Sequence, residues 1–257
     1  MRILHTLVIA LAALGAASCA NDEKELFRLP AAARIDQVVK NDRTARESAP
    51  TGWKFNYILG RDYSGPGVSM MVTFRNGKAT MASDASDTAL FRTADYDVVK
   101  DQGPVLTFNT FLEPIHSLAG GMASFPEGRQ GDYEFSILST SADTIRLRGK
   151  KWGNDMLLTR TPVGLKQDSV IMGAIKMREN MITDSIYLTH GKDTIPGAAF
   201  DLDNRHFDIN GAVHLSSPMV FTPKGFTLAR PLSYDGRVYH EFTWKDSART
   251  FTSTDMT

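Results

Sequence analysis

The first regular pattern of apolar positions lies between residues 31 and 47. Its apolar residues recur at spacings of three and four, which is the period of one face of an α-helix. Arginine and lysine become frequent towards its end, and Pro50-Thr51-Gly52 follows, so we expect a helix that ends before residue 50. The apolar face consists of Ala32, Ile35, Val38 and Val39.

From Trp53 onward the period changes to two, which indicates β-strands. Asn76-Gly77 separates two strand-like runs, and this dipeptide favours the tight turn of a β-hairpin. Short strands at close spacing predict an antiparallel meander, arranged as a sheet or as a barrel. The expected strands in this part of the chain are 53–57, 68–74, 96–100, 105–108, 133–138, 144–148 and 156–160.

After Pro162 the order of helix and strands is repeated. Residues 168–180 carry a second apolar stripe at helical spacing, and further strand-like runs follow it. We therefore expect a mainly β protein of antiparallel meander sheets or barrel-like halves, each preceded by a helix. The predicted halves are residues 31–162 and 163–257, and the alternative is one continuous sheet that crosses residues 162–167. The expected later strands are 185–189, 199–202, 206–209, 219–221, 225–228, 237–244 and 250–252.

The first 18 residues have the layout of a cleavable signal peptide. Arg2 precedes an apolar stretch over residues 3–17, which is too short for a comfortable membrane span of about 20 residues. Ala16-Ala17-Ser18 then precedes Cys19, the single cysteine of the chain, and this run resembles a lipobox. We predict that Cys19 is lipidated after cleavage; the alternative is an ordinary signal peptide with an incidental cysteine.

Residues 19–30 are predicted to form a tether between the lipid and the folded body. Its start, at residues 20–25, is short and acidic and looks like the segment that directs Bacteroidota lipoproteins to the cell exterior. The alternative is a plain flexible linker. The predicted location is the outer membrane, with a lipid anchor and the body facing outward.

Charge gives no further indication of a partner. The chain has 29 basic and 29 acidic side chains, and loss of residues 1–18 removes only Arg2, which leaves 28 and 29 and a net charge of −1. A nearly neutral body has no electrostatic surface for nucleic acid, so no nucleic-acid partner is expected.

The sequence carries no familiar catalytic or metal-binding motif. It lacks a Gly-x-Ser-x-Gly nucleophile turn, its one cysteine is assigned to lipid, and no two histidines lie three to five residues apart. The aspartate-rich run at residues 201–208 fails the calcium-loop pattern, because His206 and Ala212 stand where glycine and glutamate are needed. We expect neither a metal nor a cofactor.

The remaining candidates for a ligand site are carboxylates and aromatic residues. A glycosidase needs two facing carboxylates, and Glu113, Glu127, Asp132 and Glu134 lie close in sequence. The favoured interpretation is a strand whose wet face carries Asp132 and Glu134 and whose packed face carries Tyr133 and Phe135.

Sugar binding would use an exposed aromatic face. Trp53 and Trp244 lie within strand patterns and are expected in the core, whereas Trp152 lies in a polar turn and is expected to be exposed. The longest irregular stretch is residues 113–130, which contains His116. The candidate ligand-binding residues are therefore Trp152, Glu113, His116, Asp132 and Glu134.

A further resemblance rests on eight separated blocks of the chain: residues 25–27, 33–35, 52–53, 101–110, 116, 131–135, 147–151 and 218–226. These blocks resemble a family of Bacteroidota surface lipoproteins known only as a domain of unknown function. The resemblance implies a cell-surface lipoprotein associated with SusC/SusD-like nutrient-uptake systems, and it implies no reaction. Family members usually continue past residue 257, so the chain departs from the pattern in length.

The favoured hypothesis is a non-enzymatic surface lipoprotein that binds a glycan or another nutrient as an accessory to an uptake system. One alternative is a structural or interaction subunit without a small-molecule ligand. Another is a glycoside hydrolase that uses an Asp/Glu pair.

Overall fold

The computed structural model describes residues 30–86, 88–121, 126–181, 188–190 and 192–253. The predicted signal peptide, the predicted lipidation site at Cys19 and all but the last residue of the predicted tether lie outside these residues. The chain divides into two compact units, 1–36 and 37–257. Helix α2 (Ala31–Glu47) begins in the first unit and ends in the second, with the bounds expected from its apolar pattern.

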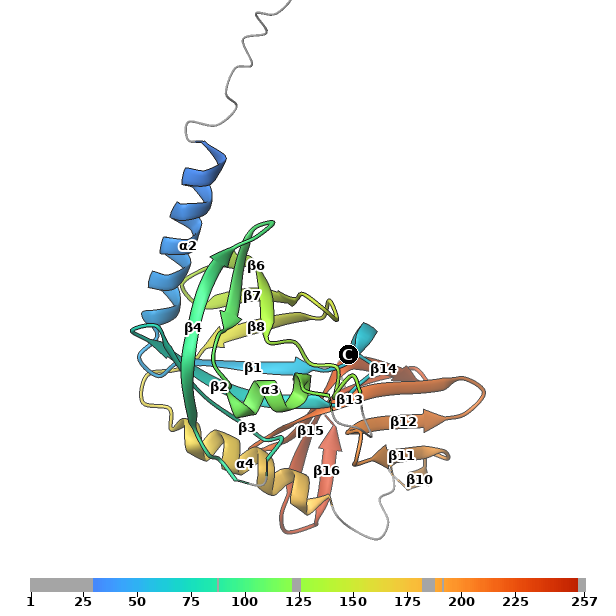
Figure 1. The fold of residues 1–257 in the computed structure, drawn as a ribbon. Helices are drawn as coiled ribbons and strands as arrows, with labels where there is room; N and C mark the ends of the chain where they lie inside the picture. The colour runs from blue at the N-terminus through green and yellow to red at the C-terminus, as the bar shows by residue number, and fades with distance from the viewer. Residues whose placement is uncertain (1–29, 87, 122–125, 182–187, 191, 254–257) are drawn as a thin grey trace, which may run out of the picture. The chain divides into compact units, whose positions relative to one another are not determined.

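Strands β1 to β8 form a closed antiparallel barrel in which each strand pairs with the next along the chain (Figure 1). The barrel closes where β1 pairs with β8, with Trp53 opposite Arg160 and Phe55 opposite Leu158. The expected hairpin at Asn76-Gly77 is confirmed: both residues have positive φ, as the turn requires, and β2 pairs with β3. The strands are β1 (Trp53–Ile58), β2 (Gly67–Arg75), β3 (Lys78–Ser83), β4 (Arg92–Lys100), β5 (Pro104–Phe108), β6 (Glu134–Thr140), β7 (Thr144–Gly149) and β8 (Asp155–Arg160).

The interior of the barrel is filled by its own side chains. Alternate residues of each strand point inward, as the period of two predicts, and they form one buried cluster. The space left among Phe55, Phe135, Met156 and their neighbours is only about 10 Å³, which is room for no more than one water molecule. A ligand site must therefore lie on the outside of the barrel or at one of its ends.

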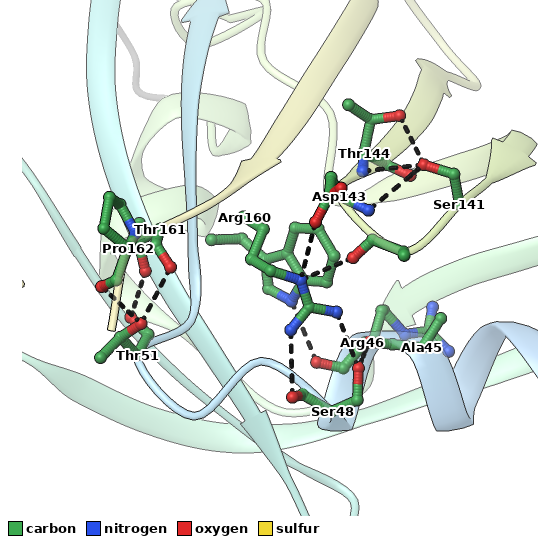
Figure 2. A network of polar contacts seen from close by, with 12 residues as sticks. Ala45, Arg46, Ser48, Thr51, Ser141, Asp143, Thr144, Arg160, Thr161 and Pro162 are labelled. Carbon is green, nitrogen blue, oxygen red and sulfur yellow. Dashed lines mark hydrogen bonds and ion pairs between the residues drawn. The ribbon is translucent and has the colours of Figure 1, made fainter. Parts of the chain in front are cut away.

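The end of α2 covers one end of the barrel. The side chains of Asp42 and Arg46 are buried there and form an ion pair of 2.7 Å. Figure 2 shows how Arg160 ties β8 to the connection between α2 and β1: its Nη1 donates to the carbonyl oxygen of Ser48 (3.0 Å) and its Nη2 to the hydroxyl (2.8 Å). The Arg160 guanidinium also stacks over the ring of Trp53 at 5.0 Å.

The opposite end of the barrel is formed by residues 59–66, by residues 109–121 and 126–133 of the connection between β5 and β6, and by turn 150–154. We call these residues the rim. Hydrogen bonds join these segments: the Gly60 N–H donates to the carbonyl of Gln130 (3.2 Å), and the Asn154 side-chain amide donates to the carbonyl of Gly60. The rim also contains helix α3 (Glu113–Ala119), whose Ile115 and Leu118 are buried in the barrel core. The expectation that residues 113–130 are irregular was therefore wrong over α3.

Helix α4 (Gln167–Asn180) joins the barrel to a second sheet, and it begins one residue before its expected start. Ile171 and Ile175 pack on Met71 and Ala82 of the barrel wall, whereas Ala174 and Met177 belong to the core of the second sheet. This sheet consists of β11 (Ala198–Asp201), β12 (His206–Asn210), β13 (His214–Thr222), β14 (Gly225–Tyr234), β15 (Arg237–Lys245) and β16 (Thr250–Ser253), and a small separate hairpin pairs β9 (Thr189–His190) with β10 (Asp193–Thr194).

A buried ion pair fastens the second sheet to the barrel. The guanidinium of Arg205, in the turn between β11 and β12, donates to the Asp84 carboxylate (3.0 Å) and to the carbonyl of Gly67 (2.9 Å). The Ser69 N–H donates to the same carboxylate (2.9 Å). These contacts give hydrogen-bond partners to Oδ1 of Asp84 and to the carbonyl of Gly67, which would otherwise be buried without them.

The mainly β, antiparallel fold class is confirmed. Most of the expected strands occur within a few residues of their predicted bounds, but the strand expected at residues 185–189 lies largely outside the described residues. Among the described residues, no helix is long and apolar enough to cross a membrane.

Candidate ligand-binding site

Four of the five predicted ligand residues, Glu113, His116, Asp132 and Trp152, lie in the rim, and Glu134 begins the strand that follows it. Their surroundings differ, and the predictions made for two of them were wrong.

Trp152 is buried rather than exposed, with only 9 % of its surface accessible. The turn that carries it folds against Asp132, whose carboxylate accepts hydrogen bonds from the N–H groups of Lys151 (2.6 Å) and Trp152 (3.2 Å). The Lys151 ammonium and the Arg61 guanidinium then cover the indole, at 4.8 and 5.7 Å from its ring. The indole is therefore part of the packed rim and presents no open face to a ligand.

The other two tryptophans also differ from each other. Trp53 is fully buried in the barrel, as expected, and its indole N–H donates to the carbonyl of Arg46 (3.0 Å). Trp244 is only half-buried on the second sheet, where its indole N–H donates to Asp246 (2.8 Å). Trp244 therefore lies at the margin of the core and not inside it: it packs against the core of the second sheet and contacts the ring of Phe251 on β16, with centroids 4.7 Å apart.

Asp132 is buried, so the expected wet face shared with Glu134 was wrong. Strand β6 begins only at Glu134, and Asp132 precedes it in an irregular conformation with 4 % of its surface exposed. Burial raises the pKa of the Asp132 carboxyl, although the hydrogen bonds from Lys151 and Trp152 lower it in part. Asp132 thus holds the rim turn in place, and its oxygens are already occupied.

Tyr133 was expected to pack inward, but 45 % of its surface is exposed. Its ring stacks on the imidazole of His116, with centroids 4.9 Å apart and an interplanar angle of 22°. Phe111 lies against the same imidazole at 5.4 Å, and 72 % of its surface is exposed. The three rings form a group on the outside of the rim, which we call the aromatic platform.

The imidazole of His116 is fixed by its own helix. The N–H of Leu112 donates to Nδ1 of His116 (3.0 Å), which fills one ring nitrogen and sets the direction of the ring. The backbone of Tyr133 is also held, because its carbonyl accepts the N–H of Phe108 (3.3 Å). Glu113 lies three residues before His116 on α3, so the two side chains occupy neighbouring positions on one face of the helix.

Sequence reasoning found His116 and Glu113 but missed the two exposed rings. Tyr133 was placed on the packed face because the alternation of β6 was extended back over residues 132 and 133, which precede the strand. Phe111 follows the end of β5 and precedes Pro114, and a large aromatic residue in such a connection was the signal that could have identified it.

The carboxylates near the platform have local partners. The Glu127 carboxylate accepts a hydrogen bond from the side chain of Gln130 (3.2 Å), and Glu134 lies 3.9 Å from the ammonium of Lys150. Among the described residues, no three His, Cys, Asp or Glu side chains are grouped so that they could hold a metal ion. The platform is suited to binding a flat or ring-shaped surface, with Glu113 as a nearby hydrogen-bond acceptor.

A family model described as a domain of unknown function, DUF4302, matches residues 23–246. The chain belongs to the DUF4302 family. No curated protein and no solved structure matches it significantly. The part matched by the DUF4302 model includes the whole barrel, α4 and the second sheet up to the end of β15, so the aromatic platform lies within it.

Proposed function

We propose that this DUF4302 chain is a lipid-anchored protein of the bacterial cell surface that binds a glycan through the aromatic platform. More specifically, we propose a Bacteroidota outer-membrane lipoprotein that serves a SusC/SusD-like uptake system. The lipid attached at Cys19 and the acidic segment after it would hold the barrel outside the cell, where polysaccharides are encountered. The protein acts by binding and carries out no reaction.

The observation that supports glycan binding most is the exposure of Phe111 and Tyr133 around the fixed imidazole of His116. Exposed aromatic groups of this kind are unfavourable in water and mark interaction sites. A sugar ring has one face of C–H groups, which can lie on an aromatic ring, and an edge of hydroxyls, which a carboxylate such as Glu113 can bind.

The test is a glycan array probed with the full chain and with Phe111→Ala and Tyr133→Ala. Both residues are partly exposed, so their loss should leave the fold intact. The matched control is Leu157→Ala, which removes another exposed apolar side chain (49 % exposed) from the outer wall of β8. We expect the wild-type chain and the control to bind the same glycans, and the two platform variants to lose most of the signal. Absence of binding to any glycan, or equal binding by all four proteins, would count against the proposal.

The second candidate is an interaction subunit whose platform docks on a partner protein in the outer membrane. Phe111 favours it, because an apolar ring with 72 % of its surface exposed is also typical of protein interfaces. Co-purification from outer membranes separates the two: a partner that is retained by wild type and lost in Phe111→Ala, together with no glycan binding, supports the interaction subunit.

A further inference from the structure

A groove of about 450 Å³ lies between the barrel and the second sheet, outside the aromatic platform. Its barrel side is formed by the end of β1, loop residue Tyr63 and the start of β8, and its other side by β13, β14 and β15. The walls are mainly apolar, with Ile58, Val220 and Leu228 among them. This volume lies within the range of small-molecule sites, which are apolar clefts with a few placed polar groups.

Backbone irregularities occur on both sides of the groove. Asp62 and Tyr63 are consecutive non-glycine residues with left-handed φ angles of 56° and 60°, a conformation that is unfavourable for a bulky tyrosine. Across the groove, the pairing of β14 with β15 shifts register between Thr227 and Leu232, as at a β-bulge. Strained residues and bulges are common beside functional sites, where they direct side chains away from regular positions.

Contacts with Asp62 and Tyr63 across the groove hold the side chain of Arg230, on β14, in a defined position. The Arg230 guanidinium stacks over the ring of Tyr63 at 5.1 Å, and its Nη2 donates to the carbonyl of Asp62 (2.8 Å). The Tyr63 hydroxyl in turn accepts the N–H of Asp155 (3.0 Å). Within the described part of the chain, Nε and Nη1 of Arg230 have no hydrogen-bond partner, so they remain for a ligand.

The charges that line the groove favour an anion. Asp155 is the only carboxylate among the lining residues, and Arg148 already neutralises it with two hydrogen bonds, from Nε (2.6 Å) and Nη2 (3.1 Å). Arg230 is the one lining residue with a permanent positive charge, and no carboxylate is paired with it among the described residues. The half-buried His240 and the exposed Asn56 supply further polar groups.

We propose that this groove is a second binding site, which takes an organic carboxylate with an apolar body. Arg230 binds the carboxylate through its free N–H groups, and the walls formed by Ile58, Val220 and Leu228 cover the apolar part. The site is independent of glycan binding, because none of its lining residues belongs to the aromatic platform.

The test uses two probes of nearly identical shape, 4-fluorobenzoate and the neutral 4-fluorobenzamide, whose binding to the full chain is followed by fluorine NMR. Arg230→Gln removes the proposed anion-binding group. Arg75→Gln is the matched control, since it removes an exposed arginine from the end of β2 that lies away from the groove. A second variant, His240→Gln, changes the lining of the groove but keeps the permanent positive charge of Arg230.

We expect wild type and Arg75→Gln to bind the benzoate about tenfold or more tightly than the benzamide, because a hydrogen-bonded ion pair is stronger than a neutral contact. Arg230→Gln should lose this preference while keeping the unfolding temperature of wild type, and His240→Gln should keep the preference. Failure of wild type to bind the benzoate at millimolar concentration, or equal affinities for the two probes, overturns the proposal. So does an unchanged preference in Arg230→Gln. Phe111→Ala should leave benzoate binding intact, so the failure of the glycan proposal and the failure of this one are distinguishable.

Discussion

His116 and Tyr133 stack face to face on the rim of the barrel, 4.9 Å apart at 22°, although they come from different elements of the chain. The Leu112 N–H fixes the imidazole, and the Phe108 N–H fixes the backbone of Tyr133. The two rings are therefore already ordered before any ligand arrives. A binding surface that is ordered in advance loses less conformational entropy when the ligand binds.

The buried carboxyl of Asp132 predicts a change of stability with pH. Burial raises its pKa in the folded state, so the folded protein holds this proton more tightly than the unfolded chain does. The contribution of Asp132 to the free energy of unfolding is therefore greatest below about pH 4, which is near the pKa of an aspartate in an unfolded chain. This contribution is lost as the pH rises through the pKa of Asp132 in the folded protein. Asp132→Asn cannot titrate. In urea unfolding at a series of pH values, the variant should gain stability relative to wild type as the pH rises from about 4. A constant difference between the two proteins would show that Asp132 is not perturbed.

Gly149 makes room for the same carboxylate. A Cβ atom at Gly149 would overlap the Oδ2 of Asp132, whose position is set by its hydrogen bonds to Lys151 and Trp152. We expect Gly149→Ala to lower the free energy of unfolding by about 1–3 kcal/mol, as overpacking does in other proteins. Gly103→Ala is the control, because a Cβ there meets no atom within 4 Å. Equal stability of the two variants in urea unfolding would mean that the Asp132 contact is not tight.

The buried ion pair between Asp84 and Arg205 predicts a large effect of one substitution. Arg205→Met leaves the Asp84 carboxylate buried without its cation, and we expect a loss of about 3–5 kcal/mol in the free energy of unfolding. Arg148→Met also breaks an ion pair, the one between Arg148 and Asp155. Both residues of this pair are partly exposed, so the substitution should lower the free energy of unfolding by no more than about 1 kcal/mol. Similar losses for the two variants in urea unfolding would contradict the structural role given to Arg205.

Local patterns predicted the helix over residues 31–47 and the hairpin at Asn76-Gly77, because spacing and turn type determine these features within a few residues. The same patterns did not distinguish an open sheet from a closed barrel. Closure requires Trp53 to pair with Arg160, which lies more than 100 residues later in the chain. The burial of Trp152 was mispredicted for a related reason. Its polar neighbours indicated a surface turn, but its position is set by Asp132, 20 residues earlier.

The candidate site was only partly visible in the sequence. Glu113 was selected as one of several carboxylates close in sequence and His116 as part of a long connection, and the structure places His116 at the centre of the aromatic platform. Asp132 and Tyr133 precede the first residue of β6, so the alternation of the strand does not determine which way their side chains point. The groove around Arg230 was not predicted, because it exists only where two sheets distant in sequence meet.

The proposed lipid anchor is tested by Cys19→Ala. If Cys19 carries the lipid, the variant should be released from membranes after signal cleavage, whereas wild type should stay with the membrane fraction. Fractionation followed by immunoblotting of both proteins measures this. Ser18→Ala, which keeps the cysteine and a small residue before it, serves as the control. A Cys19→Ala protein that is cleaved and yet remains membrane-bound would refute lipidation as the means of attachment.

Calorimetric titration with a glycan selected on the array measures whether the exposed rings of Phe111 and Tyr133 bind a sugar. We predict saturable binding by wild type and by Leu157→Ala. The double variant Phe111→Ala/Tyr133→Ala should bind at least about tenfold more weakly, with an unchanged unfolding temperature, because each lost aromatic contact contributes about 1 kcal/mol. A folded double variant that binds the glycan as tightly as wild type would show that the two rings are not the binding surface.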